Sequence, residues 1–282
     1  MIRRRGIDGQ AEGVGVSIEG RQPPPVVINA DDLGMSPAVN HAILSALELG
    51  LVSSATIMAT MPAFDEACQA VLARGLSDRI GVHLSLTEGS PCSEAIRRLP
   101  ALVTGEGVLR RRGTTVWVLR QREAQAIAAE LAAQIQAVIA AGIRPAHLDS
   151  HHHVHTQWPI AAIVIALARR FEIPAVRLSR TCGSGIGVTK RVYKAAVNAR
   201  FARAGLALTS DFGSVADIAT LKAPRRPLEV MVHPAFDGGG RIIDRGHPEW
   251  PLDEVRDRLP ELGRLVSYRE LATMRAEARR SA

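Results

Sequence analysis

The chain alternates short apolar runs with longer amphipathic segments, and this alternation limits the folds open to it. The first such run, Val26–Asn29, is of the type found in a parallel strand buried on both faces. A helix is predicted next, because Ser36 and Pro37 are typical of a helix start and Gly50 of a helix end. The same order recurs along the chain, so the sequence predicts an α/β fold with a parallel sheet.

Further elements are predicted where apolar or amphipathic segments are bounded by glycine or proline. The later strands are Ser54–Thr60, Ile80–Thr87, Ala146–Ser150, Ala175–Ser179, Ala207–Ser210, Leu228–His233 and Leu265–Tyr268. The helices are Ser36–Leu49, Ala63–Arg74, Glu123–Ala141, Pro159–Arg170, Lys190–Ala204, Leu252–Leu259 and a terminal helix. This pattern fits a (β/α) barrel, seven- or eight-stranded and with room for irregularity, and a doubly wound open sheet is the alternative.

The alternation covers only part of the chain. Residues 1–24 contain five glycines and no periodicity, so we expect a disordered or loosely attached leader. Residues 25–282 show no linker and are predicted to form a single (β/α)-barrel domain. Within it, the long segment Glu88–Val118 lacks periodicity, as is usual for functional or disordered loops. The glycines of Thr181–Gly187 do not match a dinucleotide-binding motif, and a flexible active-site loop is predicted there.

Composition excludes several classes of function. The three cysteines are scattered and odd in number, which favours a cytoplasmic protein without disulfides. The strongest apolar run, Ile160–Leu167, is much shorter than the ~20 residues of a membrane-spanning helix, and no secretory signal is recognisable. The net charge of +7 comes mostly from dispersed arginines, and aromatic residues make up only 4%, so nucleic acid is not an expected partner. A homodimer is left open.

Histidines are concentrated in the stretch Ala146–His155, which holds five of the nine in the chain. In an extended backbone His151, His153 and His155 would face one side, and His152 would face the other, into the fold. Imidazoles at the carboxyl end of a strand suit a divalent metal. Taken alone, the stretch is equally compatible with a solvated histidine run that has only adventitious affinity.

Reactive side chains also lie at other predicted strand ends. Asp31 and Asp32 follow the first strand, His83 lies in the third, and His233 ends a late one. Active sites of α/β folds form at the carboxyl ends of parallel strands. A carboxylate with two imidazoles would be the ligand set of a catalytic metal that keeps positions open for water and substrate. The alternatives are helix capping for the aspartates and satisfied core positions for the histidines.

Four motifs contain these residues. They are Asn29-Ala-Asp-Asp-Leu-Gly34, Gly81-Val-His-Leu-Ser-Leu-Thr87, His147-Leu-Asp-Ser-His-His-His-Val-His155 and Val230-Met-Val-His-Pro234. In this combination and order the sequence resembles the YdjC-like carbohydrate deacetylases, from about Val26 into the 260s. The resemblance implies a barrel of the glycoside hydrolase/deacetylase type. It also implies metal-dependent removal of N-acetyl groups from N-acetylglucosamine-containing saccharides or glycolipids.

The same resemblance implies a role for each residue. Asp32, His83 and His151 would bind one divalent metal ion, Mg²⁺ or Zn²⁺. Asp31 would be the general base that takes a proton from the attacking water, and His233 the general acid that protonates the leaving amine. The metal would activate that water and polarise the acetyl carbonyl.

Other residues near the site keep more than one expected role. His153 and His155 would orient ligands, line the pocket or bind a second metal, and Asp149 would orient a ligand histidine. Arg177 would contact substrate oxygens or form a salt bridge. Leu33 stands where the family usually has an aromatic residue, which would change the pocket wall.

Two alternatives to a deacetylase remain open. One is another barrel metallohydrolase that acts on an amide, ester or phosphate through two metals. The other is a non-catalytic carbohydrate- or metal-binding relative, which would need neither a base at Asp31 nor an acid at His233. The low aromatic content favours short substrates over a long sugar-stacking groove, and the acetylated sugar itself is left open.

Overall fold

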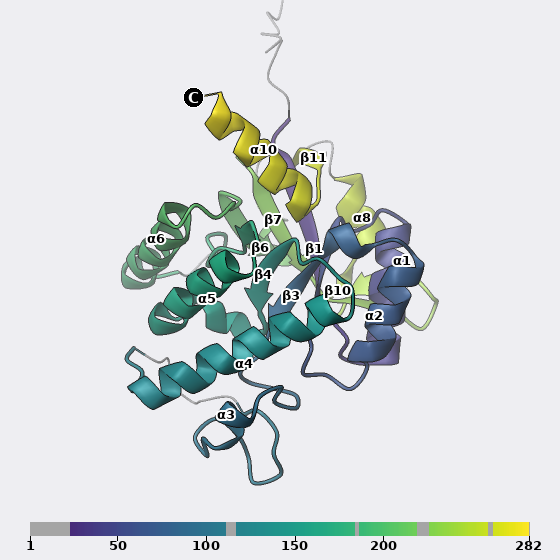
Figure 1. The fold of residues 1–282 in the computed structure, drawn as a ribbon. Helices are drawn as coiled ribbons and strands as arrows, with labels where there is room; N and C mark the ends of the chain where they lie inside the picture. Colours follow the sequence, from purple (N-terminus) through teal and green to yellow (C-terminus); the bar gives the residue numbers. More distant parts are fainter. Residues whose placement is uncertain (1–22, 111–116, 184–185, 219–225, 259–261, 282) are drawn as a thin grey trace, which may run out of the picture.

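The computed structural model describes residues 23–110, 117–183, 186–218, 226–258 and 262–281. Its main sheet is entirely parallel, with the strand order β5-β4-β3-β2-β1-β7-β6, and β11 pairs with the start of β1. The strands are β1 (Pro25–Leu33), β2 (Ser54–Ile57), β3 (Ile80–Leu84), β4 (His147–Ser150), β5 (Ala175–Val176), β6 (Asp211–Ser214), β7 (Leu228–Val232) and β11 (Arg264–Leu265). The sheet curls into a half-barrel with helices around it (Figure 1), and the predicted α/β barrel class is confirmed.

The helices and a small second sheet complete the fold. The α-helices are α1 (Pro37–Glu48), α2 (Phe64–Ala73), α3 (Glu94–Arg97), α4 (Gln121–Ala140), α5 (Trp158–Arg170), α6 (Val188–Arg203), α7 (Val215–Ile218), α8 (Leu252–Asp257) and α10 (Tyr268–Arg280). Two 3₁₀ helices are η1 (Ser77–Arg79) and η2 (His151–Thr156). The antiparallel second sheet follows β7 directly and consists of β8 (Pro234–Phe236), β9 (Ile242–Asp244) and β10 (His247–Pro251). No helix within the described ranges is long and apolar enough to cross a membrane.

The two edges of the curled sheet approach each other at one point. Ala207, which precedes β6, forms an isolated parallel bridge with Ala175 of β5. The backbone amide of Val176 donates a hydrogen bond to the carbonyl of Ala207. A doubly wound open sheet keeps its edge strands apart, so this bridge favours the barrel over the predicted alternative.

The alternation of side chains along β1 separates the outer core from the barrel interior. Val26 and Ile28 belong to the large apolar cluster that includes the helices. Val27 belongs to a second, smaller cluster, and Asn29 and Asp31 follow on its side of the strand. The barrel interior is therefore apolar at the start of β1 and polar toward its end.

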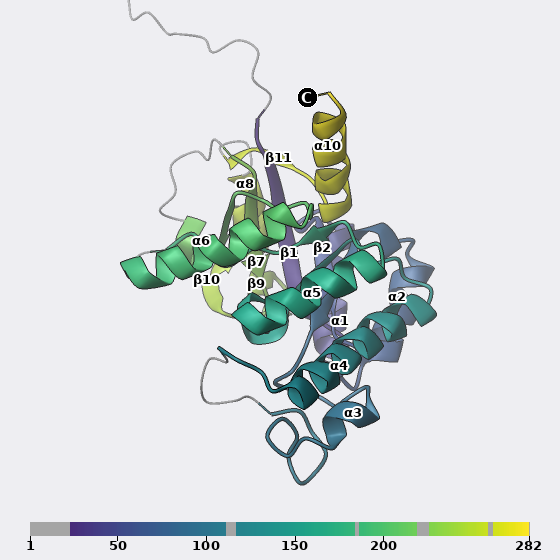
Figure 2. The ribbon, with the colours of Figure 1, turned by 60° about the vertical axis from the view of Figure 1, so that its left-hand side comes forward.

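Helix α10 closes the amino end of the barrel. In Figures 1 and 2 it lies at the end of the sheet where β1 begins. Its first residue, Tyr268, is fully buried in the second cluster and stacks on His147, with ring centroids 3.8 Å apart. The helix starts there because Ser267 and Glu270 form a reciprocal capping box.

Several predicted boundaries differ from the structure. The strand predicted at Ala207–Ser210 forms four residues later as β6, and only Ala207 pairs with β5. The strand predicted at Leu265–Tyr268 is shorter, because Ser267 caps the next helix. The strand predicted at Ala175–Ser179 has only two residues in β5. Of the predicted leader, residues 1–22 lie outside the described residues.

Candidate metal and catalytic site

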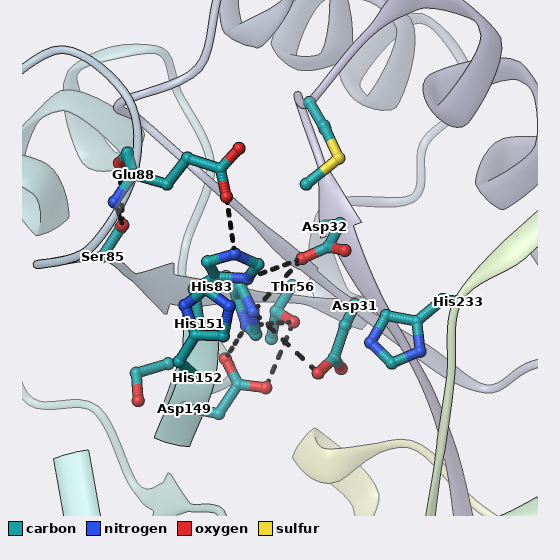
Figure 3. A network of polar contacts seen from close by, with 12 residues as sticks. Asp31, Asp32, Thr56, His83, Ser85, Glu88, Asp149, His151, His152 and His233 are labelled. Atoms are coloured by element: carbon teal, nitrogen blue, oxygen red, sulfur yellow. Dashed lines mark hydrogen bonds and ion pairs between the residues drawn. The ribbon is translucent and has the colours of Figure 1, made fainter. Parts of the chain in front are cut away.

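The predicted metal-ligating residues meet at the carboxyl end of the barrel (Figure 3). Oδ1 of Asp32 lies 3.1 Å from Nδ1 of His151 and 3.5 Å from Nε2 of His83. Each of the three side chains offers one donor atom within 4.8 Å of the others. Three residues from β1, β3 and η2 are therefore close enough to share one metal ion.

A local irregularity in β1 brings both aspartates to this site. Successive side chains of a regular strand point to opposite faces, so neighbouring residues would not both reach it. Pairing with β2 shifts register between Ala30 and Leu33, and Asp32 has a left-handed φ of 74°. Aspartate tolerates this conformation better than most residues. Asp31 and Asp32 are both almost completely buried.

The histidine stretch is not extended, contrary to the prediction. Strand β4 ends at Ser150, and η2 begins at His151, with left-handed φ values of 52° at His152 and 54° at His153. Oγ of Ser150 accepts a hydrogen bond of 2.9 Å from the backbone amide of His155, which turns the chain back on itself. His151, His153 and His155 therefore do not share one face.

His152 lies at the surface and not inside the fold, so its predicted orientation is wrong. Its Nδ1 is 2.9 Å from Oγ1 of Thr87, and its ring centroid is 4.0 Å from that of His151. The left-handed backbone turns this side chain toward the segment that follows β3.

The hydrogen bonds and ring contacts of His153 and His155 are with residues other than Asp32, His83 and His151. Nδ1 of His155 is 2.5 Å from Oγ of Ser150, and its Nε2 is 3.1 Å from the carbonyl oxygen of Arg177. His153 packs edge-on against Phe212 and His155. Burial lowers the pKa of His153 to about 3 and that of His155 well below its usual value, so both imidazoles are neutral. Neither belongs to a metal-ligating group in the described part of the chain.

Arg177 lies at the centre of the barrel and is completely buried. Its two terminal nitrogens donate to the two oxygens of Asp31 at 2.6 and 2.7 Å. Nη1 also lies 2.7 Å from Asp149, and Nε lies 2.7 Å from Glu229. Arg177 was expected either to contact substrate oxygens or to form a salt bridge, and in the structure it forms salt bridges. Glu229 was not predicted, although a single charged residue inside the apolar strand β7 is a signal of a polar interior.

Asp149 holds the ring of His83, as the sequence led us to expect. Its Oδ1 lies 2.7 Å from Nδ1 of His83, and its Oδ2 accepts a 3.2 Å hydrogen bond from Thr56. The other ring nitrogen of His83 then faces Asp32. Carboxylates in this position fix the ring orientation of metal-binding histidines.

His233 follows β7 and lies beside Asp31 in Figure 3. Its backbone amide donates to Asp244 at 2.7 Å, and its Nδ1 lies 3.6 Å from the same carboxylate oxygen. Burial lowers the pKa of His233, but Asp244 and the negative charges of Asp31 and Asp32 raise it more, so its net shift is upward. Asp244, at the end of β9, was not predicted as a site residue. Its only signal in the sequence is that an acidic residue follows two isoleucines.

The buried charges shift the pKa values of the site in opposite directions. Burial raises the pKa of Asp31, but Arg177 and His83 hold it well below its usual range. Burial likewise raises the pKa of Asp32, which the imidazoles of His151 and His83 bring down to about 2. For His83 burial lowers the pKa, and Asp149 and Asp31 raise it to about 9. Both aspartates are therefore ionised at neutral pH.

The residues present fit a divalent cation. Oδ1 of Asp32 is buried and has no hydrogen-bond partner among the described residues, and it faces both imidazoles. The barrel interior buries three carboxyl groups around the guanidinium of Arg177, namely Asp31, Asp149 and Glu229. Asp32 is bonded to a second guanidinium, Arg245, through its other oxygen, so its Oδ1 stays open toward the two imidazoles. In a second group of potential ligands, Asp31, His83 and Asp149, both carboxylates are already bound by Arg177.

The fold and the site together define an α/β barrel protein with a carboxylate–imidazole site that can hold a metal ion. Residues 25–280 match the model of the YdjC-like protein family. The chain belongs to this family, and the resemblance seen in its motifs is confirmed.

Relatives of this chain include named deacetylases. It is 32% identical over 214 residues to a carbohydrate deacetylase of Halalkalibacterium halodurans, and the matched region covers 75% of this chain and 85% of that protein. It is 35% identical over 218 residues to a chitooligosaccharide deacetylase of Klebsiella pneumoniae strain 342, and this matched region covers 75% of this chain and 81% of that protein. A crystal structure of a candidate cellobiose-phosphate cleavage protein from Enterococcus faecalis V583 has the same fold, with a TM-score of 0.64, 24% identity and coverage of 89% of this chain and 99% of that one.

Proposed function

We propose that this chain is a carbohydrate N-deacetylase that requires one divalent metal ion and acts on N-acetylglucosamine-containing saccharides or glycolipids. The observation that carries the proposal is the convergence of Asp32, His83 and His151 on a common point, with Asp31 adjoining and His233 beside it. Membership of the YdjC-like family supports the same reaction, because relatives covered over most of their length are named carbohydrate deacetylase or chitooligosaccharide deacetylase.

Asp32, His83 and His151 would hold the metal. One carboxylate and two imidazoles suit Zn²⁺, whereas Mg²⁺ prefers oxygen ligands and would need several waters to complete its coordination. When bound, the ion would lower the pKa of a coordinated water and polarise the acetyl carbonyl.

Asp31 would act as the general base. Arg177 keeps its carboxylate ionised and fixes both oxygens, and Asn29 donates a further hydrogen bond of 2.9 Å. An oriented, ionised carboxylate next to the metal ligand Asp32 can accept a proton from the attacking water. The low pKa of Asp31 makes it a weak base, so its contribution depends on its orientation and on the acidity of that water.

His233 would act as the general acid. Its raised pKa favours the protonated ring, and Asp244 holds the imidazole from the side of β9. Its side chain is 27% exposed, so substrate can reach it. As the bond between the acetyl carbon and nitrogen breaks, His233 would donate its proton to the leaving amine, and acetate would be the other product.

We also propose a cytoplasmic location. The three cysteines of the chain, Cys68, Cys92 and Cys182, are free thiols in the structure. Free thiols persist in a reducing compartment. Because Cys68 and Cys182 are buried, the test of this location is the fraction of each thiol that an alkylating reagent labels in denaturant directly after cell lysis.

The proposed function is tested by acetate release from a panel of N-acetylglucosamine monomer and oligomers, with and without a chelator. We expect release that the chelator abolishes and that one equivalent of metal per chain restores. Elemental analysis of the purified protein should give the same stoichiometry. Two metals per chain would favour the two-metal hydrolase, and metal-loaded protein that releases no acetate would favour a non-catalytic relative.

A further inference from the structure

We infer that Glu88 is a positioning residue whose carboxylate sets the ring orientation and proton position of His151. The inference rests on the proposed metal site and adds a residue to it. Glu88 lies four residues after the end of β3, and Figure 3 shows its side chain reaching over the His151 ring. Its Oε2 is 2.9 Å from Nε2 of His151, on the side of the ring opposite Asp32.

Both nitrogens of His151 are therefore engaged by carboxylates. A neutral imidazole carries one N–H and one lone pair, and only the lone pair can bind a metal. Glu88 is an acceptor, so it holds the N–H on Nε2. The lone pair is then on Nδ1, which faces Oδ1 of Asp32 at 3.1 Å.

The other ligand histidine has the same arrangement with the nitrogens exchanged. Asp149 contacts Nδ1 of His83 at 2.7 Å, and Nε2 of that ring faces Asp32 at 3.5 Å. In each imidazole, the ring nitrogen that faces away from Asp32 thus contacts a carboxylate, Asp149 for His83 and Glu88 for His151. The first carboxylate is buried, whereas the side chain of Glu88 is 51% exposed, so its position must be fixed by the backbone that carries it.

A tight turn fixes that backbone. Oγ of Ser85 accepts a 3.2 Å hydrogen bond from the amide of Glu88 and donates a 2.8 Å hydrogen bond to its carbonyl. Gly89 follows with a φ of 89°, and a Cβ on it would clash with the carbonyl oxygen of Thr60. Only glycine fits at this position, which locks the end of the turn against the segment after β2.

Two buried polar side chains of helix α4 hold the turn and the segment after it. Gln134 accepts from the amide of Ser85 at 2.9 Å and donates to its carbonyl at 2.7 Å. Glu130 accepts from the amides of Cys92 and Ser93 at 2.9 and 2.8 Å. The start of the segment Glu88–Val118, which shows no periodicity in the sequence, is thus held rigidly where it meets the site.

The inference is tested by the metal affinity of the purified, full-length protein in the absence of substrate. Zn²⁺ affinity is measured by competition with a chromophoric chelator for the wild type, Glu88→Ala, Glu88→Gln and the control Glu106→Ala. Glu106 is exposed in the same segment. Loss of a carboxylate that orients a ligand histidine lowers metal affinity roughly 10- to 100-fold, which we expect for Glu88→Ala. Glu88→Gln keeps an acceptor and should lose less affinity, and the control should stay within about twofold of the wild type.

The outcomes separate this inference from the proposed function. If Glu88→Ala binds Zn²⁺ as tightly as the wild type while its KM rises, Glu88 contacts substrate and the inference is wrong. If affinity falls as expected but no variant and no wild-type sample releases acetate, the inference stands and the deacetylase proposal fails. If Asp32→Ala also retains wild-type affinity, the metal lies elsewhere and the inference falls with the proposed site.

Discussion

Two neighbouring aspartates have different surroundings, and this difference separates their expected roles. Both oxygens of Asp31 are bonded to Arg177, so this carboxylate is fixed in the barrel interior. Asp32 has one oxygen bonded to Arg245 at 2.8 Å, and its other oxygen faces the two imidazoles. Substitution of Asp31 should therefore affect turnover, whereas substitution of an imidazole that faces Asp32 should affect metal binding.

Asp31→Asn should keep the metal and lose turnover, whereas His83→Ala should lose the metal. The asparagine cannot accept a proton from water, and loss of a general base typically costs about 10²- to 10⁴-fold in rate. His83→Ala removes one of three ligands. Metal content by elemental analysis and turnover by acetate release check the two variants together. Wild-type turnover in Asp31→Asn, or full metal content in His83→Ala, would refute these roles.

At the level of residues, sequence motifs identified the polar groups at four strand ends but not all their partners. Asp31, Asp32 and His83 stand out because acids and histidines interrupt apolar strands. Asp244 and Arg245 were not found, because they are two adjacent charged residues in a region without a motif. They reach the site only because the hairpin of β9 and β10 folds back over it, a contact between distant parts of the chain.

Among the elements, β3 shows how tightly the barrel interior is packed. A Cβ on Gly81 would lie 2.5 Å from the ring of His147, which in turn stacks on Tyr268. This glycine does not have a positive φ, so its requirement is space and not backbone conformation.

Gly81→Ala should therefore destabilise the protein, while Gly105→Ala should not. The added methyl forces the His147 ring to shift, and overpacking of this kind typically costs about 1–3 kcal/mol in the free energy of unfolding. A Cβ on Gly105 would have no described neighbour within 4 Å, which makes this position a matched control. Chemical denaturation of both variants checks the prediction, and equal stabilities would show that the interior can accommodate the methyl.

The elements that could be predicted from sequence are those with strong local signals. Helix α1 begins where Ser36 and Pro37 indicated, and the side chain of Ser36 caps the amide of Val39. The turn after β4 could not be predicted, because it depends on Oγ of Ser150 bonding to the backbone of His155 and on two left-handed histidines. Periodicity describes regular backbone and gives no signal for such a turn.

Over the whole molecule, a buried polar column connects the site to the opposite end of the barrel. Arg177 binds Asp31 toward the carboxyl end of the barrel and Glu229 toward its amino end. The hydroxyl of Tyr268 donates a hydrogen bond to Glu229, so the first residue of α10 closes the column. The C-terminal helix thereby supports the guanidinium that orients the proposed base.

This column predicts a pH dependence of stability. Burial raises the pKa of Glu229 from 4.5 to about 7, although the charge of Arg177 and the hydrogen bond from Tyr268 favour its ionised form. The unfolded chain therefore releases this proton at a lower pH than the folded protein does. Because the folded protein binds more protons between these two values, its free energy of unfolding should fall as the pH rises through them.

Glu229→Gln removes this titration, so its stability should depend less on pH than that of the wild type. From about pH 5 to about pH 8, the free energy of unfolding of the wild type should fall relative to that of the variant by up to about 3 kcal/mol. Chemical denaturation at both pH values gives the two slopes, and the comparison of slopes cancels the constant cost of losing the charge next to Arg177. Glu106→Gln, at an exposed position, should follow the wild-type slope. Parallel slopes for the wild type and Glu229→Gln would show that Glu229 is already ionised at the lower pH and that Arg177 outweighs burial in the column.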